Sequence, residues 1–115
     1  MNTIIKEIYQ KGMQTTHFFI GQIIQHKLFN YRGIIFDVDF QFSGTDDWYN
    51  DVAHSRPSKQ QPWYRILVDN ASHQTYVAEQ NLNLSESLLA INNPLIDDYF
   101  TKTANNVYAS KLIKN

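Results

Sequence analysis

Two aspartates two positions apart are the strongest candidates for chemistry in this sequence of 115 residues. Asp37 and Asp39 lie in a stretch of alternating apolar and polar residues, so on a β-strand their carboxylates share one face. Such a pair could act as general acid and base or bind a metal, with Asp46, Asp47 and Asp51 joining from the next segment. A solvent-exposed strand has the same pattern, and we expect that simpler arrangement.

Four histidines are the next candidates, because imidazole is a common general base and metal ligand. They are His17, His26, His54 and His73, and none has the HxH, HxxxH or HExxH spacing of zinc sites. The sequence has no cysteine, which excludes disulfides, thiolate ligands and cysteine nucleophiles. It also lacks the GxGxxG, Walker and GxSxG motifs. We therefore expect no catalytic residue, no metal and no cofactor, that is, a protein that is not an enzyme.

Two pairs of aromatic residues could instead bind another macromolecule: Trp48 with Tyr49, and Trp63 with Tyr64. Neighbouring residues of a strand point to opposite faces, so one of Trp63 and Tyr64 is expected outside the core. An exposed ring can stack on a base or anchor a partner protein. Rings that cover one end of the core would have the same sequence pattern, so both alternatives stay open.

Four segments that would position these side chains have the composition of β-strands. The clearest is 33–41, where Ile34, Phe36, Val38 and Phe40 are expected on one face. Tight turns are expected at 29–33, where Asn30 and Gly33 allow unusual backbone angles, and at 69–72. The other strands are expected at 22–28, 63–69 and 73–78. Short strands with tight turns predict a mainly β fold, a small closed or nearly closed barrel.

The remaining segments flank this core within a single domain of residues 1–115. Residues 1–17 form a leader, and 42–61 is a short helical insertion in which Ser43 or Thr45 caps the helix. Residues 83–115 are expected to form a helical tail, with one helix capped by Ser85 and a second begun by Pro94. Four apolar residues of the tail are expected to lie together on a helical spacing: Leu95, Ile96, Tyr99 and Phe100. If the barrel leaves them uncovered, they form an exposed apolar patch, which predicts a homo-oligomer.

The charge balance gives little support for a surface that binds phosphates. Ten basic and eleven acidic residues leave a formal net charge of −1, and residues 18–82 alone carry five basic against seven acidic residues, or −2. Only the end of the chain, residues 101–115, carries charges of a single sign, which are the positive charges of Lys102, Lys111 and Lys114. No signal peptide is visible and the apolar runs are too short to span a membrane. We expect a cytoplasmic protein without a membrane partner.

Two groups of motifs resemble a known family. The first runs from Gly21-Gln22 through His26 to Tyr31-Arg32-Gly33 and Asp37-Val38-Asp39. The second runs from Gln61-Pro62-Trp63-Tyr64 through Val68-Asp69 to Tyr76-Val77-Ala78-Glu79-Gln80-Asn81-Leu82. In this order they are similar to the HspQ family, also called the YccV-like hemimethylated-DNA-binding domain, over residues 18–82. The resemblance implies an SH3-like β-barrel, a bacterial heat-shock role in the stress response, binding of hemimethylated DNA, and a part in protein degradation through the Lon protease.

The leading hypothesis is a protease adaptor that modulates the turnover of denatured or regulatory proteins, with the protease and its substrates as partners. The alternative is a module that binds hemimethylated DNA. For the adaptor, the partner surface is expected at Trp63, Tyr76 and Glu79. For the alternative, phosphate contacts are expected from Lys27, Arg32 and Arg65, with Lys111 and Lys114 from the tail, and groove contacts from Tyr31 or Trp48.

Overall fold

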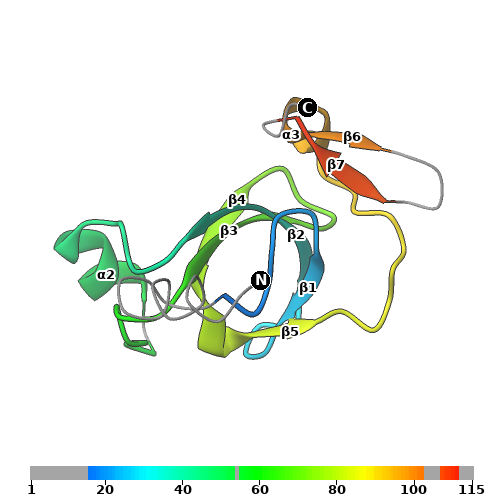
Figure 1. The fold of residues 1–115 in the computed structure, drawn as a ribbon. Helices are drawn as coiled ribbons and strands as arrows, with labels where there is room; N and C mark the ends of the chain where they lie inside the picture. The colour runs from blue at the N-terminus through cyan, green and yellow to red at the C-terminus, as the bar shows by residue number, and fades with distance from the viewer. Residues whose placement is uncertain (1–15, 54, 103–106, 112–115) are drawn as a thin grey trace, which may run out of the picture.

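The computed structural model describes residues 16–53, 55–102 and 107–111, and a five-stranded antiparallel sheet is its largest element. The order of the strands across the sheet is β4-β3-β2-β1-β5 (Figure 1). The mainly β fold predicted from the sequence is confirmed. The strands are β1 (Ile23–His26), β2 (Arg32–Asp39), β3 (Trp63–Val68), β4 (Gln74–Ala78) and β5 (Leu82–Leu84).

The sheet curls into an incomplete ring and does not close (Figure 1). The 3₁₀ turn η1 (Glu79–Asn81) leads directly from β4 to β5, which are the two ends of the sheet. No ladder joins these two strands within the described residues, so of the two expected alternatives, a closed and a nearly closed barrel, the closed one is wrong. Each end strand has a single neighbour in the sheet, β3 for β4 and β1 for β5. Consequently β4 keeps one edge that no strand of the described residues pairs with.

The sheet has an apolar cluster on each of its two faces. The inner core, on the concave face, contains the fully buried Ile24, Tyr64 and Ile66. The outer core, on the other face, joins the sheet to the C-terminal segment through Phe100 and Tyr108. The other buried members are Ile35, Val77 and Leu82 in the inner core and Ile23, Ile34, Phe36, Leu67, Ile91 and Ile96 in the outer core.

A β-bulge in β2 changes the expected alternation. The register with β3 shifts between Ile35 and Asp37, so the bulge falls at Phe36. Ile34 and Phe36 therefore pack in the outer core, whereas Ile35 and Val38 belong to the inner one. The prediction that Ile34, Phe36 and Val38 share a face is wrong, because the extra residue reverses the alternation after it.

The excursion between β2 and β3 contains the expected short helix, α2 (Asp46–Val52). Thr45 is its N-cap, in extended conformation, and its hydroxyl accepts a hydrogen bond from the backbone N–H of Trp48 at 3.1 Å. Asp46 and Asp47 occupy the first turn, where the partial positive charge of the helix end stabilises carboxylates. The prediction of a Thr cap followed by two acids is confirmed.

Replacing Thr45 with alanine should lower the free energy of unfolding by about 1 kcal/mol, because the Trp48 N–H loses its acceptor. Urea titration followed by tryptophan fluorescence measures this loss, since Trp48 lies in α2. Ser43→Ala is the matched control, because the contact at that residue comes from its backbone N–H. Equal midpoints for the two variants would contradict the capping role.

The C-terminal segment is mostly not helical. After β5 the chain is irregular up to a single four-residue helix, α3 (Ile96–Tyr99), which is followed by a hairpin of β6 (Phe100–Lys102) and β7 (Tyr108–Ser110). The expected helix after Ser85 is absent from these described residues: the Ser85 hydroxyl donates to the Ser87 carbonyl instead of capping, and the Arg32 guanidinium binds the carbonyls of Ser87 and Leu89. Helices among the described residues are all too short and too polar to cross a membrane.

The apolar group of the tail packs inside the chain. Ile96 and Phe100 are buried in the outer core, and Leu95 and Tyr99 pack against it, with the Tyr99 ring 4.5 Å from that of Phe36. The surplus patch that suggested a homo-oligomer is therefore covered by the sheet. Oligomerisation stays a prediction that these four residues no longer support.

Candidate functional site

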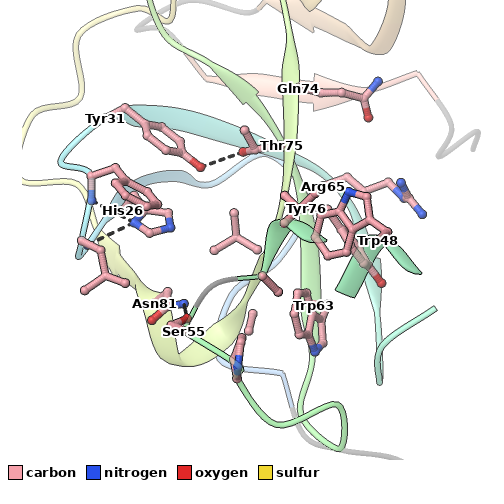
Figure 2. Close-up of a pocket in the computed structure, with 17 residues that line it drawn as sticks. His26, Tyr31, Trp48, Ser55, Trp63, Arg65, Gln74, Thr75, Tyr76 and Asn81 are labelled. Atoms are coloured by element: carbon pink, nitrogen blue, oxygen red, sulfur yellow. Dashed lines mark hydrogen bonds between the residues drawn. The ribbon is translucent and has the colours of Figure 1, made fainter. Parts of the chain in front are cut away.

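A groove of about 650 Å³ runs along β4. All five residues of this strand line it. One wall comes from the end of β1 and the turn after it, including His26 and Tyr31, and the other from α2 and β3, including Trp48 and Trp63 (Figure 2). Where β4 ends, the Asn81 amide donates to the Ser55 hydroxyl at 3.4 Å, which links η1 to the loop after α2.

The first wall is held by a buried histidine. Nδ1 of His26 accepts hydrogen bonds from the backbone N–H groups of Leu28 and Phe29, both at 3.1 Å. The Phe29 ring stacks at 4.8 Å from the imidazole, and Asn30 completes the reversal with a φ of 59°. Tyr31 then ties the wall to β4, because its hydroxyl lies 2.7 Å from that of Thr75. Only an unprotonated Nδ1 can accept both bonds, so the turn requires the neutral ring.

Burial lowers the pKa of His26 below its usual value of 6.5. As the pH falls, the imidazole is therefore protonated in the unfolded chain before it is protonated in the folded one. The contribution of His26 to the free energy of unfolding is complete above pH 6.5 and declines as the pH falls below that value. We expect His26→Asn to show a weaker loss of stability between pH 7.5 and 5, because its Oδ1 accepts similar bonds without titrating. Urea titrations across this pH range measure the difference. A variant that keeps the full pH dependence would contradict the assignment to His26.

The second wall is an aromatic cluster that consists of Phe42, Trp48, Tyr49, Trp63 and Tyr76. Phe42 lies at its centre, with its ring 5.0 Å from Trp63 and 5.5 Å from Tyr49. The Lys59 ammonium sits 4.4 Å from the Tyr49 ring and 2.8 Å from the Asp46 carboxylate. The excursion that carries α2 thus covers the outer face of β3.

The expectation that Trp63 or Tyr64 lies outside the core is wrong. Trp63 is 1% exposed beneath the aromatic cluster, and Tyr64 is 0% exposed in the inner core. The two rings do point to opposite faces, but both faces of β3 are covered. The alternative in which the rings cover one end of the core is the one that the structure supports.

The two strand aspartates form an ion-pair network with β3. Arg65 Nε lies 3.8 Å from Asp37 Oδ2, and Arg65 Nη2 lies 3.8 Å from Asp39 Oδ2. The Tyr76 hydroxyl donates to Asp39 at 2.6 Å, and burial together with this carboxylate raises the pKa of Tyr76. The described residues contain no group of three carboxylate or imidazole side chains that could hold a metal. The carboxylates of Asp37 and Asp39 are paired with Arg65, and their side chains are 48% and 25% exposed.

Glu79 has an internal role as well. Its carboxylate accepts a hydrogen bond from the Tyr64 hydroxyl at 2.5 Å and lies 2.6 Å from His17 Nδ1. Burial and the bond to Glu79 raise the pKa of Tyr64. With its side chain 13% exposed, Glu79 is a poor surface contact. Of the expected partner surface, only Trp63 and Tyr76 line the groove.

The structure places some of the residues expected to contact DNA in the groove and others outside it. Arg65, Tyr31 and Trp48 line the groove, whereas Lys27 is exposed outside it. Arg32 is engaged: its guanidinium donates to Asp69 at 3.0 Å, to Ser85 at 3.2 Å and to the carbonyls of Ser87 and Leu89. The ammonium of Lys111 donates to the Asp97 carbonyl. The predictions for His54 and Lys114 fall outside the described residues.

The sequence interpretation missed the exposed apolar residues of the groove. Leu28 and Phe29 are 55% and 70% exposed on the first wall, and Val52 is 51% exposed on the second. The signal for the first two was their position, because an adjacent Leu and Phe in a tight turn bury little surface unless something packs on them.

The chain matches one known protein family over most of its length. The chain matches a family model described as hemimethylated DNA-binding protein YccV like, over residues 16–107. The match extends well beyond the quoted motifs, which end at Leu82, and includes β6. It covers far more than half of the sequence, and the chain therefore belongs to the YccV-like family.

Proposed function

We propose that this chain is a non-enzymatic binding protein that modulates the degradation of denatured or regulatory proteins by a protease such as Lon. The observation that carries the proposal is the apolar groove along the free edge of β4. Membership of the YccV-like family supports the remaining parts, which are an SH3-like curvature of the sheet and a stress-linked role in the bacterial cytoplasm.

The charges of the groove favour a polypeptide over a polyanion. Of the residues that line it, only Arg65 carries a full charge at neutral pH, and Asp37 and Asp39 counter it. Nucleic-acid affinity comes largely from cations that neutralise phosphates. A denatured protein segment, by contrast, offers apolar side chains to surfaces such as those of Leu28 and Phe29.

Degradation of casein by purified Lon, with and without the chain, tests this proposal. We expect the rate to rise with the concentration of the chain and to saturate. A short fluorogenic peptide is the control, because its cleavage reports the protease active sites alone. An unchanged rate for casein at saturating chain would contradict an adaptor role.

Binding of hemimethylated DNA is the second candidate, and the family match favours it. Fluorescence anisotropy with hemimethylated, fully methylated and unmethylated duplexes at about 150 mM salt tests it. Lys27→Ala is the variant of choice, because Lys27 is exposed whereas Arg32 holds the fold together. Sub-micromolar binding that distinguishes the methylation states and is weakened by Lys27→Ala would place DNA first.

A further inference from the structure

The backbone of β4 presents unpaired hydrogen-bonding groups along its free edge. At one end of the strand the Val68 N–H donates to the His73 carbonyl at 3.2 Å, and beyond the other end the Glu79 N–H donates to the Pro62 carbonyl at 2.9 Å. Antiparallel pairs alternate, so every second residue between these points bonds to β3 and the others face away. The outward positions are Gln74, Tyr76 and Ala78, whose backbone N–H and C=O groups have no partner among the described residues.

This edge lacks two of the features that usually protect one, and only its Ala78 end is covered. Sheets commonly block a free edge with charged residues, proline or a covering element. The sequence of β4 is Gln-Thr-Tyr-Val-Ala, which has neither a charge nor a proline. Gln74 is exposed and Tyr76 is partly exposed, whereas Ala78 is 1% exposed, so the accessible part of the edge is the half that begins at Gln74. An open edge inside a groove is suited to accept another strand.

We propose that the β4 edge binds an extended, uncharged apolar segment of a denatured polypeptide as an added strand of the sheet. The inference rests on the proposed function, whose partner it describes at the level of backbone hydrogen bonds. The polypeptide backbone is the occupant that complements the edge, because it supplies donors and acceptors at the strand repeat. Charge complementarity agrees, since the lining has no uncountered full charge for an acidic or basic segment to pair with.

The two walls define what the added strand would carry. Successive side chains of a strand point to opposite sides. One set would face Leu28 and Phe29 of the first wall, and the other would face Trp48 and Val52 of the second. Both sets meet apolar surface, and the backbone bonds do not depend on sequence. The site therefore selects for extended apolar segments as a class.

A labelled peptide of about seven residues tests the proposal, because it is long enough to pair with the whole of β4. The probe alternates valine with serine or threonine, carries a fluorescein label and binds the full chain in an anisotropy titration. Its counterpart has the same side chains with alternate backbone nitrogens methylated. We expect methylation to weaken binding at least ten-fold, because it removes donors and blocks pairing. Equal affinities for the two peptides would overturn the added-strand geometry.

Variants at Gln74 test the same contact from the protein side. Gln74→Pro removes one outward N–H, which is the position where an edge strand accepts proline, and should weaken binding of the unmethylated peptide by about five-fold to ten-fold. Gln74→Ala keeps the N–H and should bind as the parent does. Circular dichroism and thermal melts show whether the proline variant is folded. If the proline variant is not folded, the comparison of the methylated and unmethylated peptides still tests whether the β4 edge binds an added strand.

The Lon assay separates this inference from the proposed function. Stimulation of casein degradation that survives Gln74→Pro, together with methyl-insensitive peptide binding, would overturn the β4 site and leave the adaptor role standing. Peptide binding that depends on backbone N–H groups, without any stimulation of Lon, would keep the site and overturn the adaptor role. Displacement of the peptide by duplex DNA at about 150 mM salt would assign the groove to nucleic acid instead and overturn the inference.

Discussion

Arg32→Ala should lower the free energy of unfolding by about 3 to 5 kcal/mol, the cost of breaking a largely buried ion pair. The side chains of Arg32 and Asp69 are 18% and 12% exposed, and their closest atoms are 3.0 Å apart. Without the guanidinium, Asp69 keeps only its bond from the Asn92 N–H, at 2.7 Å. The segment after β5 loses three further bonds, to Ser85 and to the carbonyls of Ser87 and Leu89.

Urea titration of the variant against the parent measures this loss. Lys27→Ala is the matched control, because it also removes one positive charge but comes from an exposed residue, and it should stay within about 0.5 kcal/mol of the parent. Arg32→Lys should fall between the two, since an ammonium cannot reproduce the planar fork that reaches several acceptors. An Arg32→Ala protein of parental stability that has lost DNA affinity would identify Arg32 as a DNA contact instead.

Local features of the fold could be predicted from the sequence. The Thr45 cap and the turn that contains Asn70, with a φ of 56°, depend on residues a few positions apart. The helix expected after Ser85 failed for a non-local reason. Carbonyls of that segment are bound by Arg32, 55 and 57 positions earlier in the sequence. No local pattern encodes a competitor at that distance.

The candidate site was predictable only in part. Tyr31, Trp48, Arg65, Trp63 and Tyr76 were selected for their type, and the structure brings all of them to one groove. Their roles could not be read from type, because Arg65 is countered by carboxylates and Trp63 is buried. The free edge of β4 follows from the order of the strands, which emerges only when the sheet is assembled. A sequence shows that a strand exists more readily than it shows which neighbour that strand lacks.

Gly33→Val should also destabilise the chain, by about 3 kcal/mol, although the reason differs from the one that the sequence suggested. The unusual backbone angle of the turn belongs to Asn30, with a φ of 59°. Gly33 lies instead within β2, where an added Cβ would come within 2.4 Å of the Ile66 Cγ2 atom and 2.6 Å of the Leu67 carbonyl oxygen. Relief requires β2 and β3 to separate, because one of the two clashing atoms is backbone.

Two substitutions distinguish the close approach of the strands from the demand of the turn. Asn30→Gly should leave the free energy of unfolding within about 0.5 kcal/mol of the parent, because glycine adopts a positive φ without strain. Gly33→Ala should already be costly, since the clash arises from the Cβ atom itself. Thermal and urea melts of Gly33→Ala, Gly33→Val and Asn30→Gly measure the three effects. If both Gly33 variants have the melting temperature and urea midpoint of the parent, the close packing of β2 against β3 at this position is contradicted.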